Sequence, residues 1–188
     1  MLEFYQAYAD YTDLMELTEA LFAELAQSLK GSLRLTWGEH AIDLTPPWRR
    51  LPFFAGLSEA LGVDVTPATD PAAVARAAAA RGIAHDGGPA WKLWKAVFET
   101  LIEPTLVQPT FVVDFPIELS PLAKKKRDNP LLVDRFELFV GRRELANAYS
   151  ELNDPEDQLA RFHEQAALQS RGDDEAHWLD EDYVRALE

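Results

Sequence analysis

The segment from Asp134 to Asp154 constrains the fold of this chain more than any other stretch. Within it, the apolar residues Phe136, Leu138 and Val140 recur at every second position, which is the period of a β-strand. Gly141 follows as a turn residue, and a second run with strand-like alternation comes after it. The segment therefore predicts a β-hairpin with acidic side chains on both of its strands.

Two of these acids, Glu137 and Glu144, are predicted to share one face of the hairpin. With a two-residue turn, directly opposed residues have numbers whose sum is odd, and side chains alternate between the faces along each strand. Like charges at close range are unfavourable unless a cation lies between them or one of them takes up a proton. A divalent metal ion held by both acids is one interpretation. The other is a pair of solvated acids on the wet face of an antiparallel sheet.

The second strand places an amide, an aromatic ring and an acid on one face, in the order Asn147, Tyr149 and Glu151. Only alanine and serine lie between them, so the pattern predicts a polar pocket wall backed by a tightly packed layer. Glu144 has an even number and these residues have odd numbers, so they cannot share a face of one regular strand. If all of them serve one site, we expect a β-bulge or a sharp twist at residues 145–146.

The run RFELFVGRRELANAYSELNDPEDQ resembles the central catalytic segment of class II lysyl-tRNA synthetases. The resemblance continues, in the order of the family, through MLEFYQAYADY, QPTFVVDFP, SPLAKKKRDNP and GDDEAHWLDEDYVRALE. It implies an α+β fold, with an antiparallel β-sheet flanked by helices, of the class II aminoacyl-tRNA synthetase catalytic-domain type. Residues 1–188 would form a single partial catalytic domain with a variable insertion at about residues 45–88.

The resemblance also implies a reaction, namely ATP-dependent activation of lysine to lysyl-adenylate and transfer of the lysyl group to tRNA(Lys). The implied lysine-binding residues are Glu3, Tyr5, Asn147, Tyr149 and Glu151. Glu137 and Glu144 are implied to bind ATP and its Mg²⁺. No side chain is assigned as a catalytic acid, base or nucleophile, and the full-length protein is expected to be a homodimer.

The resemblance further implies that the domain is truncated at both ends. Members of the family carry one ATP-binding arginine before the position of Met1 and another beyond Glu188, and a β-barrel domain that reads the anticodon precedes both. We therefore expect no catalysis from the 188 residues alone. Two alternatives stay open: a stand-alone ligase that lysylates a protein such as an elongation factor, and a non-catalytic binding module.

The composition predicts a cytoplasmic protein without a membrane span. The chain is 47% hydrophobic, but no apolar run approaches the ~20 residues of a membrane helix, and no leader pattern opens it. The absence of cysteine excludes disulfides and thiol catalysis. A net charge of −14 argues against strong binding of a phosphate backbone by this piece alone. The four adjacent bases from Lys124 to Arg127 predict either contact with phosphate or the tRNA end, or a solvated loop.

The remaining segments predict supporting elements. Met1 to Tyr8 alternates like an edge strand, and Thr110 to Phe115 has the continuous β-rich pattern of a central strand. Asp10 to Leu29 predicts a helix that ends at Gly31. Its buried face is expected to carry a row of leucines at helical spacing: Leu14, Leu17, Leu21, Leu25 and Leu29. Aspartates followed by proline predict the starts of two further helices, at Asp70 and Asp154.

Overall fold

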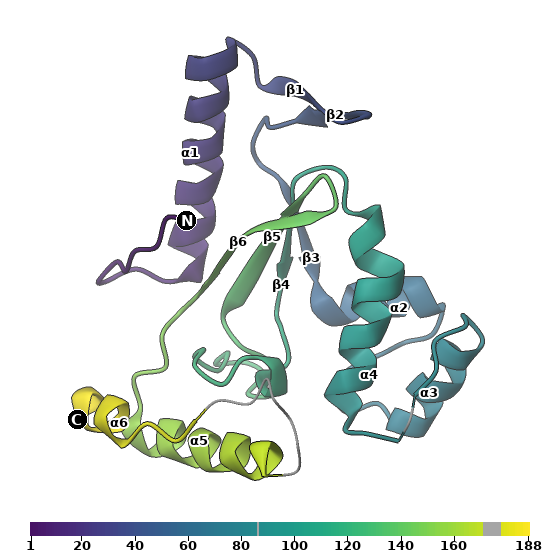
Figure 1. The fold of residues 1–188 in the computed structure, drawn as a ribbon, viewed down its shortest axis with the longest axis vertical. Helices are drawn as coiled ribbons and strands as arrows, with labels where there is room; N and C mark the ends of the chain where they lie inside the picture. Colours follow the sequence, from purple (N-terminus) through teal and green to yellow (C-terminus); the bar gives the residue numbers. More distant parts are fainter. Residues whose placement is uncertain (86, 171–177) are drawn as a thin grey trace.

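The structure is a computed structural model that describes residues 1–85, 87–170 and 178–188. A four-stranded sheet forms its centre, in the order β3–β4–β5–β6 (Figure 1). The strands are β3 (Arg49–Pro52), β4 (Thr110–Val113), β5 (Arg135–Val140) and β6 (Arg143–Tyr149). The predicted α+β fold is confirmed, and the β4, β5 and β6 pairings are antiparallel as expected. β3 differs, because it runs parallel to β4.

Helices cover both faces of this sheet (Figure 1). On one face, α1 (Tyr11–Lys30) packs through Met15 and Ala26 against Phe136 and Leu138. On the other, α2 (Phe53–Leu61), α3 (Pro71–Ala79) and α4 (Ala90–Val97) form a larger core with Val112 of β4. α4 continues into a π-turn, η1 (Phe98–Ile102), and short 3₁₀ turns follow at η2 (Glu103–Thr105) and η3 (Ile117–Leu119). Every residue of β4 is buried, as predicted for a central strand.

Two smaller units lie at the ends of the sheet (Figure 1). β1 (Arg34–Trp37) and β2 (His40–Asp43) form the small hairpin that turns at Gly38, whose φ is +59°. At the other end, α5 (Pro155–Gln169) packs against α6 (Glu181–Leu187). The sequence also predicts that the helix that begins after Asp154 ends at Gly172, because glycine commonly terminates a helix. That position lies outside the described residues.

Side-chain caps explain why the helices begin at the predicted residues. Asp10 accepts hydrogen bonds from the backbone N–H groups of Thr12 and Asp13, and Asp13 returns the contact in a capping box. At the start of α3, Asp70 accepts from the backbone N–H of Ala72, and at the start of α5, Asp154 accepts from those of Glu156 and Asp157. Each of these two aspartates is followed by proline. At the end of α1, Gly31 has the left-handed conformation expected of a terminating glycine.

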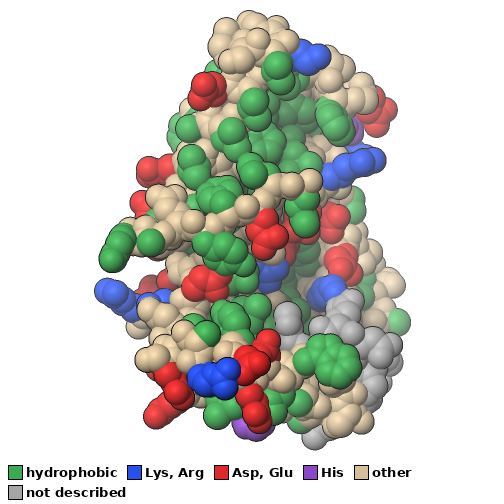
Figure 2. All heavy atoms as spheres, turned by 60° about the vertical axis from the view of Figure 1, so that its left-hand side comes forward, with side chains coloured by type: hydrophobic (Ala, Val, Ile, Leu, Met, Phe, Trp, Pro, Cys, Tyr) green, Lys and Arg blue, Asp and Glu red, His purple; other side chains and the backbone are tan. Residues whose placement is uncertain are grey.

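The predicted buried face of α1 is wrong for four of its five leucines, and only Leu14 is partly buried against the core. Leu17 is 41% exposed and Leu29 is 75% exposed, and Leu21 and Leu25 are exposed as well. The face toward the sheet instead contains Glu19, which is only 7% exposed. Glu19 can be buried on this face because its carboxylate has two partners there. It accepts a hydrogen bond from the Trp48 backbone N–H at 2.7 Å and pairs with the Arg50 guanidinium of β3. Figure 2 shows apolar side chains gathered on the surface of the side where α1 lies.

The prediction that Met1 to Tyr8 forms a strand is also wrong. These residues have no regular structure, and most of their side chains are exposed. A strand needs a neighbour for its backbone hydrogen bonds, and none of the described strands pairs with this segment. The segment instead runs along the outside of the molecule to the start of α1 (Figure 1).

Residues 45–88 take part in the central structure. They include β3 and α2, and Phe53 and Leu57 are among the most buried side chains of the larger core. That the segment is an insertion relative to the family stays a prediction.

Candidate functional site

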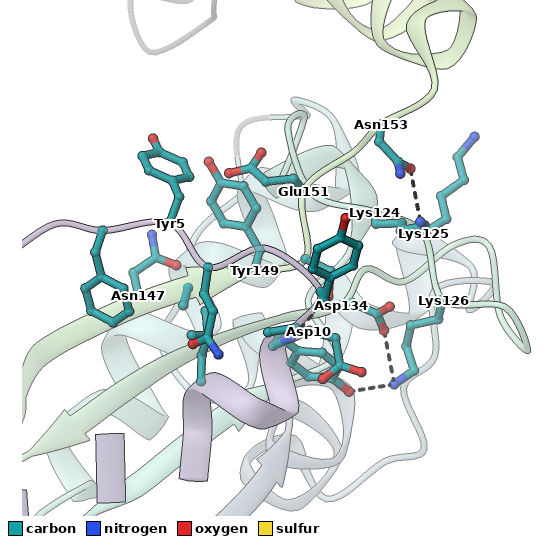
Figure 3. A pocket seen from close by; sticks show the side chains of 18 of the residues that line it. Tyr5, Asp10, Lys124, Lys125, Lys126, Asp134, Asn147, Tyr149, Glu151 and Asn153 are labelled. Carbon is teal, nitrogen blue, oxygen red and sulfur yellow. Dashed lines mark hydrogen bonds and ion pairs between the residues drawn. The ribbon is translucent and has the colours of Figure 1, made fainter. Parts of the chain in front are cut away.

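A cavity of about 860 Å³ lies between the N-terminal segment, the loop at Lys124 to Asp128 and the end of β6. All of the residues predicted to bind lysine line it, namely Glu3, Tyr5, Asn147, Tyr149 and Glu151. In the close-up view, Tyr149 lies beside Glu151 and Tyr5 lies on the other side of Tyr149, with the lysine-rich loop across from them (Figure 3). The structure thus brings together residues that are up to 148 positions apart in the sequence.

The predicted bulge is present and sets which side chains share a face. Near the turn, Phe139 is opposite Glu144, whereas farther along Glu137 is opposite Asn147, so the register shifts by one residue at Leu145. The shift puts Glu144 on the same face as Glu137 and Asn147, because paired residues point to the same side of a sheet. One extra residue in the second strand therefore allows Glu144, with an even number, and Asn147, with an odd number, to share a face.

Glu151 lies just after β6, where the chain pairs with a second segment. Its neighbours make backbone hydrogen bonds across this pairing, from Lys124 N to Ser150 O at 2.8 Å and from Leu152 N to Leu122 O at 3.0 Å. These bonds form an isolated antiparallel bridge between Ala123 and Glu151. The backbone of Glu151 is therefore held firmly although its side chain remains exposed to the cavity.

The environment of Glu151 is rich in phenol groups and poor in positive charge. Partial desolvation raises the pKa of the Glu151 carboxyl. Burial, followed by the negative charge of Glu151, raises the pKa of Tyr149 to about 12. The pKa of Tyr5 is also raised, first by Glu3 and then by Glu151. Each of these shifts would be relieved by a cation placed among the three groups.

Glu137 lies deeper than the cavity, on the face of β5 that packs toward α4. Its side chain is 15% exposed and accepts a hydrogen bond from Arg135 Nη2 at 2.6 Å. Burial raises the pKa of Glu137 to about 7, against the opposing effect of Arg135, and the charges of Glu144 and Glu103 add to the increase. Glu144 is therefore close enough to disfavour the charge of Glu137, although neither side chain lines the cavity.

Arg135 was not singled out from the sequence, yet it connects the two groups of predicted residues. Its guanidinium donates from Nε to Asn147 Oδ1 at 3.1 Å and from Nη2 to Glu137. The remaining nitrogen, Nη1, donates to Leu119 O and Ser120 Oγ, both at 2.7 Å. Arg135 could have been predicted from its place in the sequence, because it lies two residues before Glu137 in a strand and therefore on the same face.

The loop of four bases is not simply solvated. Lys124 donates to Asn153 Oδ1 and Lys125 to Asp157 Oδ1, both at 3.0 Å. Lys126 donates to Asp114 Oδ1 at 2.7 Å and to the Tyr11 hydroxyl at 3.2 Å (Figure 3). Burial alone would lower the pKa of Lys126, but its hydrogen bonds to Asp114 and Tyr11 outweigh that effect and raise it. Each of these three lysines therefore already ties the loop to another part of the protein.

Two kinds of feature are absent from residues 1–85, 87–170 and 178–188. Within these ranges, no three histidine, aspartate or glutamate side chains are arranged to hold a metal ion by themselves. Among the helices of the same ranges, none combines the length and apolar character needed to cross a bilayer.

Comparison with known proteins agrees with the resemblance read from the sequence. The family described as "tRNA synthetases class II (D, K and N)" matches residues 1–188. The chain is similar to the lysine–tRNA ligase of Carboxydothermus hydrogenoformans, with 48% identity over 189 residues. It is also similar to those of Thermoanaerobacter pseudethanolicus, with 47% identity, and Pseudomonas putida, with 48%. Each alignment covers 100% of this chain but only 38% or 39% of the relative, so the chain spans about two fifths of their length.

Proposed function

Because the chain belongs to the class II tRNA synthetases of the D, K and N group, we propose that it carries the amino-acid-binding part of a lysine–tRNA ligase active site. The observation that carries this proposal is the cavity in which Glu3, Tyr5, Asn147, Tyr149 and Glu151 meet. The reaction that we propose for the complete gene product begins with attack of the lysine carboxylate on the α-phosphate of ATP, which forms lysyl-adenylate and releases pyrophosphate. The lysyl group is then transferred to tRNA(Lys) and AMP is released.

The charge of the cavity supports lysine as the amino acid. Partial burial raises the pKa of the Glu151 carboxyl and no cation among the described residues is found to lower it, so its carboxylate is available to a ligand. An ε-ammonium is a compact cation with three donors and no acceptor, which suits one carboxylate and two phenol oxygens. The rings of Tyr5 and Tyr149 would cover the aliphatic stem and add cation–π attraction. An uncharged analogue such as norleucine would leave the acid unpaired, so we expect discrimination on the order of 10⁴-fold.

Glu137 and Glu144 are proposed to hold the Mg²⁺ that accompanies ATP. The two carboxylates fit this task, because they share a face and because the pKa of Glu137 is raised to about 7 by burial and neighbouring acids although Arg135 and Lys95 act to lower it. Mg²⁺ commonly takes only one or two carboxylates and completes its shell with water and substrate phosphates, so a set of three acids is not required. When bound, the ion would neutralise charge on the phosphate oxygens.

Arg135 would orient both parts of the site. It donates to Asn147 on the lysine side and to Glu137 on the metal side, so the two groups are kept at a fixed separation. Such positioning supplies much of the rate enhancement when two substrates must meet in line. Homodimerisation and a cytoplasmic location of the complete gene product are part of the same proposal.

Replacement of Glu151 by glutamine tests the proposed function. We expect Glu151→Gln in the complete gene product to weaken lysine binding by about 2–5 kcal/mol, because a desolvated charge partner of the ammonium is lost. Isothermal titration calorimetry with lysine measures this loss, and lysine-dependent exchange between ATP and pyrophosphate measures activation.

The matched control is Glu164→Gln, which removes the same charge from the exposed surface of α5. The control should bind lysine as the unmodified protein does. Equal lysine affinity of Glu151→Gln and Glu164→Gln would refute the proposed role of the cavity.

A further inference from the structure

Arg161 is a buried cation whose hydrogen bonds go to the backbone of another segment. It lies on α5 and is only 5% exposed. Nη1 donates to the carbonyl oxygen of Ala123 at 2.7 Å, and weaker contacts at 3.4 Å reach the carbonyl oxygens of Ser120 and Pro121. Burying a guanidinium is costly unless its donors are satisfied, so this arrangement fixes the segment that supplies the carbonyls.

The charge of Arg161 is balanced from within its own helix. Asp157, one turn earlier, accepts from Arg161 Nε at 3.2 Å and from Nη2 at 2.9 Å. Asp157 also accepts from Lys125 at 3.0 Å, so the same carboxylate holds both α5 and the loop. Burial would raise the pKa of Asp157, but the bonds from Arg161 and Lys125 lower it overall. The neighbouring Gln158 adds a bond from Nε2 to the carbonyl oxygen of Pro121 at 3.3 Å.

The segment fixed by Arg161 is the one that pairs with Glu151. Ala123, whose carbonyl oxygen accepts from Arg161, is the direct bridge partner of Glu151. The residues beside Ala123 close this bridge through the bonds from Lys124 N to Ser150 O and from Leu152 N to Leu122 O. A continuous set of hydrogen bonds therefore runs from α5, through the backbone at residues 122–124, to the backbone that presents Glu151.

We propose that Arg161 is a positioning residue that sets the place of the Glu151 carboxylate in the cavity through the backbone of residues 122–124. The proposal rests on the proposed function, in which Glu151 binds the lysine ammonium. A lysine side chain could not replace Arg161 in this role, because a single ammonium lacks the planar guanidinium that donates to Asp157 and to the Ala123 carbonyl oxygen at the same time. The charge alone is thus not sufficient, and the geometry of the guanidinium is required.

The test is Arg161→Lys in the complete gene product, which retains the charge and removes the planar guanidinium. We expect lysine affinity to fall by about 10- to 100-fold, the effect of a small displacement of a binding group, while the KM for ATP stays unchanged. Hydrogen exchange at the amides of Lys124 and Leu152 should become faster, because the bridge beside Glu151 loosens. Arg185→Lys on α6, where the arginine is exposed and pairs only with Asp182 across one turn, is the matched control and should change neither quantity.

Comparison with Glu151→Gln separates failure of this inference from failure of the proposed function. If Glu151→Gln weakens lysine binding but Arg161→Lys does not, the positioning role is refuted and the proposed function stands. If neither variant weakens lysine binding, both are refuted. If circular dichroism shows that Arg161→Lys does not fold, Asp157→Asn takes its place with the same two measurements. Unchanged lysine affinity in Asp157→Asn would refute the inference equally.

Discussion

Replacement of Glu137 by glutamine should make the protein more stable at neutral and higher pH. Glutamine has nearly the same shape and keeps an acceptor for Arg135 Nη2, but it carries no charge. In the unmodified protein the carboxylate is 15% exposed and lies near Glu144 and Glu103. Arg135, which donates a hydrogen bond to Glu137, and Lys95 of α4 both lower the pKa of Glu137, but they do not compensate for burial.

The pKa of Glu137 sets the size of the effect and its pH range. An ordinary glutamate has a pKa of 4.5, whereas burial raises the pKa of Glu137 to about 7. The folded state therefore binds this proton more tightly than the unfolded state, and the free energy of unfolding falls as the pH rises from about 4.5 to about 7. At ~1.4 kcal/mol for each pH unit in this range, the total cost of the charge is about 3–4 kcal/mol.

Urea unfolding at pH 5 and pH 8, followed by tryptophan fluorescence without Mg²⁺, measures this difference. Glu137→Gln should be about 3–4 kcal/mol more stable than the unmodified protein at pH 8, and much closer to it at pH 5. Addition of Mg²⁺ should stabilise the unmodified protein at pH 8 and leave Glu137→Gln unaffected, since binding to the folded state adds to stability. Glu16→Gln, on the exposed face of α1, is the control.

A stability difference between Glu137→Gln and the unmodified protein that is equal at pH 5 and pH 8 would refute the reasoning. It would mean that Glu137 keeps an ordinary pKa, and the electrostatic argument for a cation at this face of the sheet would fail with it.

Two further variants test the local structure. Gly141→Ala should destabilise the protein by about 1–2 kcal/mol in thermal unfolding, because Gly141 has a φ of +61° and a Cβ there would lie 3.1 Å from Trp37 Cδ1. A smaller loss of stability in a Trp37→Ala background would identify the part of the loss that comes from the clash with Trp37. No loss of stability in either background would contradict the prediction. Asp10→Ala should cost about 1 kcal/mol at pH 7 by removing the cap of α1, whereas Asp10→Asn should cost less. The hydrogen bond from the Thr12 hydroxyl lowers the pKa of Asp10, so the stabilisation is present above about pH 4 and is lost as the pH falls through the folded-state value. Equal stability of all three proteins at pH 7 would show that the cap contributes nothing.

Local chemistry made several features predictable from the sequence. The period-two pattern and Gly141 predicted the β5–β6 hairpin, and aspartates before helical runs predicted the starts of α1, α3 and α5. The bulge was predicted on the condition that Glu144 and Asn147 serve one site, and one extra residue at Leu145 does place both side chains on one face. The resemblance added the group of residues that the structure places around one cavity.

The tertiary structure decided everything that depends on a partner far away in the sequence. Which face of α1 is buried was set by Glu19, whose carboxylate is satisfied only by Trp48 and Arg50 of another segment, so a leucine count along the helix gave the wrong face. The N-terminal segment has strand-like alternation but no described strand beside it. Arg135 and Arg161 look like ordinary charged residues in the sequence, because a guanidinium acquires its role only from the carbonyls and carboxylates that folding brings within its reach.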